Sequence, residues 1–343
     1  MRSLLLIALF AVLSSCNGQI NHRRQTAFKS DSITSTRLTN SIKTTDGIVY
    51  FSTDNGLTWE SKSEGLPGTV SLQLGAIAVS DNSLGLSTKE NGVYLFDFQK
   101  NSWVSIPTDK QIIENNPGAL VFYKDHIYVG TQFGGVFFSA DKGNSWTKLN
   151  SGLSNLTIRK LAQIDNKVYA GTDAGFYSYN ELQHTWELEY GNPTLQVNGI
   201  TELDGSIYIG TNQGAFTTSK YWKNWKQIFT NRSLHNISSD DKTIYAMVYN
   251  ELFASLDKGA SWQSLQKGLP AQLYTFNVVK NGDFIFAGQW DGIYRKEKTN
   301  EAWQLYSNGL PDKLAITNMI VYKGMIIISG NERKLKKGMT TGK

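Results

Sequence analysis

Five acidic side chains stand in short polar segments between apolar, strand-like runs of the chain: Glu90, Asp173, Glu251, Asp291 and Glu332. Two carboxyl groups that face each other can hydrolyse a glycosidic bond, one as general acid and the other as nucleophile or base. Their separation decides the reaction, at about 5–5.5 Å for retention of configuration and about 6.5–9.5 Å for inversion. Whether any two of the five form such a pair depends on the elements that carry them.

Segments of the same kind also carry side chains suited to binding. Trp290 stands beside Gln289 and Asp291, and its indole ring can stack on a sugar ring or on a side chain of a partner. The alternative is that Trp290 folds down over the core of its own repeat. The other binding candidates are Phe133, Gln132, Asp173 and Gln213.

The sequence contains no recognisable metal or cofactor site. Its four histidines lack the spacing of metal ligands, and Cys16 is its only cysteine. Nucleophile-elbow, phosphate-loop and dinucleotide-binding motifs are absent as well. Asp54, Asp141 and Asp257 each stand alone in a turn, whereas Ca²⁺ takes about six to eight oxygen ligands. We therefore expect no metal and no cofactor.

A series of tryptophans marks an internal repeat of about forty residues. They stand 44, 43, 40, 39, 37 and 41 residues apart, at Trp59, Trp103, Trp146, Trp186, Trp225, Trp262 and Trp303. Before each one, apolar runs are separated by a turn, as in HIYVGTQFGGVFFSADKGNSW at 126–146. The period of two within each run predicts strands rather than helices. With a further run after each tryptophan, every repeat holds four strands.

The two ends of the repeat array complement each other. The segment 47–60 supplies only the third and fourth strands of a repeat, and 315–330 supplies only the first and second. Pairing these two halves completes a seventh unit and leaves no open end in the array. The sequence therefore predicts an all-β fold, a single seven-bladed β-propeller with four antiparallel strands per blade.

A polar turn of the form S-x-D-x-G-x-[ST]-W occurs three times. It contains Asp54, Gly56 and Trp59 in the first copy, Asp141, Gly143 and Trp146 in the second, and Asp257, Gly259 and Trp262 in the third. The carboxylate can accept hydrogen bonds from backbone N–H groups just ahead, and the glycine supplies a positive φ. The tryptophan can pack between neighbouring sheets and donate its N–H to a carbonyl. We expect a structural role for this turn.

This turn resembles the Asp-box, also called the BNR repeat. Asp-boxes occur in sialidases, β-glucan and xyloglucan hydrolases, sortilin-type receptors and photosystem assembly factors. The resemblance covers nearly all of 44–330 and implies a propeller with the box on an outer turn, while it leaves the function open. A sialidase is disfavoured, because 44–332 contains only three arginines and no RIP motif opens the domain.

The N-terminal sequence indicates export. Residues 1–15, MRSLLLIALFAVLSS, form a signal peptide with an apolar stretch too short to span a bilayer, for which about 20 residues are needed. LSSC at 13–16 resembles the lipobox of bacterial lipoproteins, which implies lipidation of Cys16 and anchoring in the bacterial cell envelope, at the outer membrane. The alternative is an ordinary cleaved signal followed by a free cysteine.

The basic residues gather at the ends of the chain. The whole chain carries +5, whereas Arg2, residues 17–43 and residues 333–343 together carry +10, so 44–332 carries −5. A nucleic-acid reader would carry a basic patch on its folded part. We therefore predict a tether at 16–43 that is rich in Ser, Thr and Asn, a propeller at 44–332 and a basic tail at 333–343, with no nucleic-acid partner.

These features together favour a non-catalytic, monomeric binding protein of the envelope. In a propeller the loops between second and third strands share one face, and these would meet a protein or glycan partner. A glycoside hydrolase other than a sialidase, or an assembly factor for a membrane complex, are the alternatives.

Overall fold

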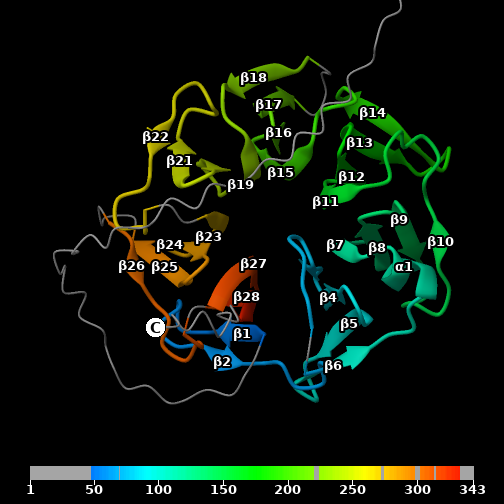
Figure 1. The fold of residues 1–343 in the computed structure, drawn as a ribbon, viewed down its shortest axis with the longest axis horizontal. Coiled ribbons are helices and arrows are strands. Elements are labelled where there is room, and N and C mark those ends of the chain that lie inside the picture. The colour runs from blue at the N-terminus through cyan, green and yellow to red at the C-terminus, as the bar shows by residue number, and fades with distance from the viewer. Residues whose placement is uncertain are drawn as a thin grey trace, which may run out of the picture. The chain divides into compact units, whose positions relative to one another are not determined.

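The computed structural model describes residues 48–68, 70–219, 224–271, 274–297, 302–312 and 314–332, which belong to one compact unit of the chain. These residues form seven four-stranded antiparallel sheets arranged in a ring (Figure 1). The first strand of each sheet lies innermost, where it contacts the first strands of both neighbouring sheets. The prediction of a seven-bladed, all-β propeller is confirmed. The predicted signal peptide, tether, Cys16 and basic tail lie outside the described residues.

Each blade is named here after its innermost strand, except for the closing blade, which joins the two ends of the array. From the inside outward, the closing blade contains β27 (Leu314–Tyr322), β28 (Met325–Glu332), β1 (Val49–Ser52) and β2 (Glu60–Ser61). The next three blades contain β3 (Ile77–Val79), β4 (Leu84–Thr88), β5 (Gly92–Asp97) and β6 (Ser102–Ser105); β7 (Pro117–Tyr123), β8 (His126–Thr131), β9 (Val136–Ser139) and β10 (Thr147–Lys148); and β11 (Ile158–Ile164), β12 (Lys167–Thr172), β13 (Gly175–Asn180) and β14 (Thr185–Tyr190). The last three contain β15 (Val197–Leu203), β16 (Ser206–Thr211), β17 (Gly214–Ser219) and β18 (Lys226–Phe229); β19 (Leu234–Ser239), β20 (Ile244–Val248), β21 (Glu251–Ser255) and β22 (Gln263–Ser264); and β23 (Thr275–Asn281), β24 (Phe284–Gln289), β25 (Gly292–Glu297) and β26 (Gln304–Leu305).

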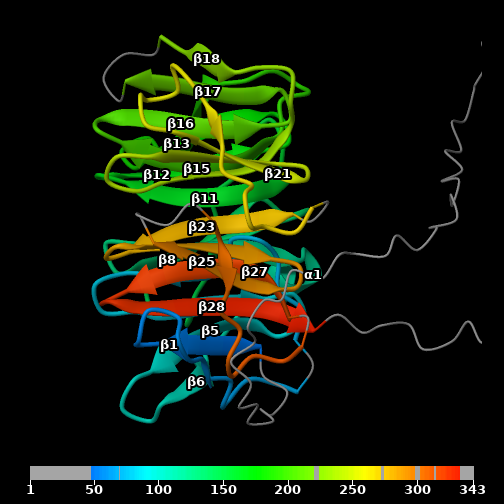
Figure 2. The same cartoon turned by 90° about the vertical axis from the view of Figure 1, so that its left-hand side faces the viewer.

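The strand directions give the ring two different faces, which Figure 2 shows from the side. The connection face carries the turns between second and third strands and the links from each blade to the next. A short helix in one of these links, α1 (Lys110–Glu114), marks this face at the right-hand edge of Figure 2. The turn face carries the remaining turns. Because β1 begins and β28 ends at the connection face, both ends of the described ring lie there.

The core lies between the blades. Each of the seven buried apolar clusters in the described residues joins two neighbouring blades, as where Val121 and Tyr128 meet Leu161 and Tyr177. Both faces of most sheets are therefore buried, which explains the continuous apolar runs of the second strands. Glycine in a second strand admits a side chain of the next blade: a Cβ on Gly288 would lie only 2.9 Å from Cγ2 of Ile316.

The repeated polar turn is stabilised by its own side chains. Oδ1 of Asp257 accepts a hydrogen bond from the amide of Ser261 at 2.8 Å, and Oδ2 accepts one from the Ser261 hydroxyl at 2.6 Å. Gly259 has a φ of +90° and donates its amide to Oγ of Ser255 at 2.8 Å. The hydrogen bonds, above all those from Ser261, lower the pKa of Asp257 to about 2. The turns at Asp54 and Asp141 form the same bonds.

Every tryptophan of the repeat series ties its blade to the preceding one. Its indole Nε1–H donates to a main-chain carbonyl within or just after the fourth strand there, at 2.7–3.0 Å in all seven cases. Trp303, for example, is 3% exposed and donates to Leu265 at 2.8 Å. The sequence Gly-Leu-Pro, which occurs at 65–67, 268–270 and 309–311, belongs to the same junction. Gly268 has a φ of +92°, and a Cβ there would lie 2.6 Å from the carbonyl oxygen of Trp303.

The ring closes by pairing the two chain ends, as the half-repeats predict. Strand β1 pairs with β28, from Val49 opposite Ser329 to Ser52 opposite Ile326. The polar turn between β1 and β2 also rests on the β23 blade, where the Arg295 guanidinium donates to the carbonyl of Asn55 at 2.6 Å.

Candidate functional site

The turns between second and third strands hold the predicted site residues on the connection face. Six such turns are present, between β4 and β5, β8 and β9, β12 and β13, β16 and β17, β20 and β21, and β24 and β25. In the closing blade the second strand and the third strand come from opposite ends of the described chain. Strand β28 runs to Glu332 and pairs with β1, which belongs to the other end of the chain. The side chain of Glu332 is outside the described part of the structure.

The other four acidic candidates are each bonded within their own blade. Glu90 accepts a hydrogen bond from the amide of Ser71 at 3.2 Å, and Asp291 accepts one from the Tyr294 hydroxyl at 3.0 Å. The remaining two form ion pairs with arginine, Asp173 with Arg159 and Glu251 with Arg232. None of these hydrogen bonds or ion pairs joins two of the four carboxylates.

Aromatic side chains gather on the connection face over two blades. His235, Tyr249, Tyr274, Phe276 and Trp290 form a continuous series of ring contacts, called here the aromatic cluster. Three of the four contacts are edge-to-face, with ring centroids 4.7–4.9 Å apart. His235 and Phe276 come from innermost strands β19 and β23, and the other rings come from adjoining turns and links. Tyr249 is 62% exposed, so the cluster reaches solvent.

Trp290 is neither fully exposed for stacking on a ligand nor buried in the core of its own repeat. It is half-buried and packs edge-on against Phe276, with centroids 4.9 Å apart and an interplanar angle of 72°. It therefore forms one edge of the aromatic cluster, neither standing free on its turn nor buried in the core of its repeat. Tyr249, Tyr274 and Phe276 were missed by sequence reasoning, which named Phe133, Trp290 and polar residues of the turns but no residue of an innermost strand or its link.

Gln289 lies inside strand β24 and is fully buried, so the expectation that it contacts a ligand at the surface is corrected. Other blades place threonine here, and Thr131 for example donates to the carbonyl of Gly135 across the turn at 2.9 Å. Gln289 instead donates to the Thr275 hydroxyl of the innermost strand at 2.6 Å. This bond fixes the start of β23, which carries Phe276. Gln289 thus supports the aromatic cluster from beneath.

The three remaining binding candidates lie in other blades. Phe133, 59% exposed, and Gln132 stand on the turn of the β7 blade, which lies across the ring from the β23 blade in Figure 1. Gln132 accepts a hydrogen bond from Asn116, and Gln213 of the β15 blade donates to Thr194 at 3.3 Å. The fold therefore does not bring these residues to the aromatic cluster.

The innermost strands share a β-bulge near the connection face. The register of first and second strands shifts in six blades, at Gly118, Arg159, Asn198, His235, Phe276 and Thr317. A bulged residue leaves the strand ladder and re-aims its side chain. In the β15 and β19 blades, this side chain reaches the next blade: Asn198 donates to the carbonyl of Leu234, and His235 bonds to that of Thr275, both at 2.7 Å.

Asparagine follows the bulge in three consecutive blades and links each blade to the next. The side-chain amides donate to main-chain carbonyls of the following blade: Asn236 to Phe276 at 2.8 Å, Asn277 to Thr317 at 2.7 Å and Asn318 to Gln73 at 2.9 Å. Successive asparagines of this set stand 41 residues apart. This spacing is visible in the sequence, but sequence reasoning from the turns alone overlooked it. They form a rigid rim beside the aromatic cluster.

Burial lowers the pKa of two titratable groups near this rim. Burial lowers the pKa of His235, so at neutral pH its uncharged ring donates through Nε2 to the Thr275 carbonyl. Burial also lowers the pKa of Lys160, the residue that follows the bulge in the β11 blade. In the described residues, no group lies within hydrogen-bonding or ion-pairing distance of the Lys160 ammonium group.

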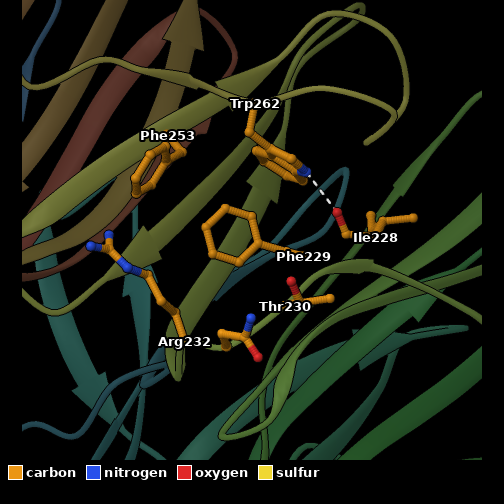
Figure 3. Close-up of a pocket in the computed structure, with 7 residues that line it drawn as sticks. Ile228, Phe229, Thr230, Arg232, Phe253 and Trp262 are labelled. Carbon is orange, nitrogen blue, oxygen red and sulfur yellow. Dashed lines mark hydrogen bonds between the residues drawn. The ribbon is translucent and has the colours of Figure 1, made fainter.

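A pocket of about 370 Å³ lies between the outer parts of the β15 and β19 blades (Figure 3). Phe229, Phe253 and Trp262 form its apolar wall, and Arg232 lies over the Phe253 ring at 5.4 Å while pairing with Glu251. Figure 3 shows the Trp262 indole bonded to the Ile228 carbonyl, so this wall belongs to the structural junction between blades. A second pocket, of about 530 Å³, opens at the turn face among residues that include Asp240, Asp241 and Lys280.

Among the described residues, no group of three or more His, Cys, Asp or Glu side chains is arranged to hold a metal ion. Nor does any helix in the same part of the chain have the length and apolar character to cross a membrane.

No family model and no curated protein matches this chain. Solved structures share its fold. The extracellular domain of BT4673 from B. thetaiotaomicron superimposes with a TM-score of 0.63 at 15% identity, over 78% of this chain and 38% of that one. The GH74 xyloglucanase from Xanthomonas campestris gives 0.60 at 13%, over 81% and 54%. YCF48 bound to a D1 peptide gives 0.59 at 11%, over 76% and 95%. At these identities the likeness establishes the propeller fold and nothing of function.

Proposed function

We propose that this protein is a non-catalytic binding protein that recognises a protein segment through the aromatic cluster. The observation that carries the proposal is the series of ring contacts across two blades, which ends in the 62% exposed Tyr249. Exposed aromatic rings held by a rigid scaffold lose little conformational entropy on binding. They are also the residues that most often dominate the affinity of protein interfaces.

The packing of the rings favours a protein segment over a glycan. A sugar ring stacks on an open, flat aromatic face, but the edge-to-face contacts cover ring faces within the cluster. The rim amides that might hold hydroxyl groups already bond to neighbouring blades, as Asn277 does to Thr317. What the cluster offers is an uneven apolar surface, which suits aliphatic and aromatic side chains.

The hydrolase alternative is weakened by the bonding of the acidic side chains. A glycosidase needs two carboxyl groups that face each other across the substrate. Asp173 and Glu251 are instead engaged by Arg159 and Arg232 within their own blades. One structural neighbour is a GH74 xyloglucanase, so release of sugar from xyloglucan is the measurement that would revive this alternative.

The export and anchoring of the protein are part of the same proposal. Lipidation of Cys16 would hold the propeller at the envelope of a bacterium, in reach of membrane-associated partners, and an assembly factor is one form of such a binding protein. Metabolic labelling with an alkyne fatty acid, comparing the full chain with Cys16→Ser, tests this step. Label that persists in Cys16→Ser, or that is absent from the unaltered chain, would refute the anchor.

Site-specific photo-crosslinking in the producing cells tests the binding surface. A photoreactive phenylalanine analogue at Tyr249 is expected to give a discrete protein adduct that Trp290→Ala diminishes. The same analogue at Leu182, which is 95% exposed on the turn face, provides the control. Identical adducts from both positions, or none from Tyr249, would contradict the proposal. An adduct that glycosidases remove would indicate a glycan partner instead.

A further inference from the structure

The position after the bulge is equivalent in six blades, and Lys160 is the only charged residue among them. Register places it opposite the second strand in the same way in each blade, where the residues are Ala119, Lys160, Gly199, Asn236, Asn277 and Asn318. The three asparagines are consumed by bonds to the next blade. Lys160 makes no such bond, so its ammonium group is not needed to hold the ring together.

The side chain of Lys160 lies along the inner wall of the ring toward residues without bulk. A Cβ added to Gly75, two blades away, would lie 3.7 Å from Cδ of Lys160 and 3.9 Å from Nζ. The same point would lie 3.8 Å from Cα of Ala119 in the blade between them. The end of the Lys160 side chain is therefore flanked by Gly75 and Ala119, two residues with little or no side chain. The amide of Gly75 is already bonded to Oδ1 of Asn318 at 2.7 Å.

Among the described residues, no ion pair or hydrogen bond compensates the ammonium group. The adjacent Arg159 is itself paired with Asp173. Protein atoms surround Lys160, yet part of the residue stays accessible to solvent. Removing an ammonium group from water without a partner costs stability, and an incoming anion recovers that cost because the desolvation has already occurred in the free protein.

We propose that Lys160 binds a carboxylate of the protein segment that docks on the aromatic cluster, and that this carboxylate reaches the ring axis from the connection face. Lys160 is the third residue of β11, which begins at that face, as do β19 and β23 with His235 and Phe276. The inference rests on the proposed function, and it specifies the partner as an acidic segment with apolar side chains beside its carboxylate.

Selection from two random peptide libraries tests this inference, using the propeller as it exists in the full chain. One library presents internal sequences and the other presents free C-termini, so that a side-chain carboxylate is distinguished from a terminal one. We expect aromatic or aliphatic residues next to Asp or Glu, or next to the chain end. Replacing the peptide carboxylate by its amide should weaken binding about tenfold or more, and Lys160→Met should do the same.

A double-mutant comparison separates a direct contact from a structural effect. With Lys160→Met, the amide and carboxylate forms of the peptide should bind equally, whereas Lys167→Met, which removes a lysine at the turn face, should leave the tenfold difference intact. Lys160→Met should melt no lower than the unaltered protein, because it removes a desolvated charge that has no partner among the described residues. Trp290→Ala should weaken both peptide forms alike.

The possible failures are distinguishable. Two outcomes would overturn this inference and leave the proposed function standing. In the first, the selected peptides require Trp290 but show no preference for an acidic residue or a free C-terminus. In the second, amidation of the peptide and Lys160→Met have additive effects on the binding free energy. If neither library yields peptides that depend on Trp290, both the proposed function and this inference fall.

Discussion

Arg295 offers the sharpest test of how the ring is closed. Its side chain is only 7% exposed, and its guanidinium lies 3.7 Å from the ring centroid of Tyr306 and 4.4 Å from that of Phe284. It also donates to the carbonyl of Asn55, which belongs to the polar turn of the closing blade. We predict that Arg295→Met loosens this turn, because methionine can fill the space between the rings but cannot donate a hydrogen bond.

The loss can be estimated from the contacts. A hydrogen bond to a charged group contributes about 1.5–3 kcal/mol, and each cation–π contact contributes about 0.5–1 kcal/mol, part of which the packing of methionine restores. A net loss of about 2–4 kcal/mol follows. Unfolding entropy is about 2.1 cal/mol/K per residue, which for residues 48–332 gives about 0.6 kcal/mol/K and a melting temperature lower by about 3–7 °C.

Calorimetry and hydrogen exchange together would check this estimate. Arg295→Met should speed exchange most at the seam between β1 and β28, where Phe51 lies opposite Ile327. Lys296→Met provides a matched control, since it removes a neighbouring positive charge that makes no hydrogen bond or ion pair within the described structure. A melting temperature unchanged within about 1 °C, or equal effects of both substitutions, would refute the role of Arg295.

Three further predictions concern the repeat itself. The pKa of Asp257 is lowered in the folded protein, so its hydrogen bonds stabilise the fold above about pH 4 and this stabilisation is lost as the pH falls toward about 2; acid titration of Asp257→Asn should show a shallower decline in that range than the unaltered protein. Gly268→Ala should destabilise by more than about 1 kcal/mol in urea, since its Cβ would meet the Trp303 carbonyl, whereas Gly282→Ala, also at positive φ but with open space around it, should cost less. Lys160→Asn should gain the inter-blade hydrogen bond that the rim asparagines form, so its free energy of unfolding should exceed that of Lys160→Met by about 1 kcal/mol. A free energy of unfolding below that of Lys160→Met would show that the rim positions are not equivalent.

Sequence reasoning reached the fold because its markers either recur at a regular spacing or form contacts within a few residues of one another. The spacing of the tryptophans gives the blade count, since each indole must meet the preceding blade. The polar turn is also local: the carboxylate of Asp257 and its donor Ser261 stand four residues apart, so their bonds follow from the sequence alone. The half-repeats at the two ends were sufficient to predict the pairing of β1 with β28.

The candidate site was less accessible to sequence reasoning because its contacts join distant residues. The rings of Tyr249 and Tyr274 meet across two blades, and Asn236 bonds to a carbonyl forty residues further on. A bulge in an innermost strand cannot be read from alternation of apolar and polar residues, since it breaks that alternation by one position. Gln289 shows the same limit: it was placed in a turn, whereas the threonine positions of other blades identify it as the last residue of a buried strand.

Departures from the repeat therefore indicate function more directly than the repeat itself. Where a blade keeps threonine before the second turn, asparagine after the bulge and tryptophan after the polar turn, each side chain is consumed by a bond that holds the ring together. Three residues depart from this repeat: Gln289 replaces the threonine, Lys160 replaces the asparagine, and Trp290 lies outside the tryptophan series. Trp290 belongs to the aromatic cluster and Gln289 supports it. Lys160 places a charge without a partner among the described residues on the inner wall near the same face. The proposed carboxylate would supply the negative charge that Lys160 lacks among the described residues, and it would bring these departures into one binding surface.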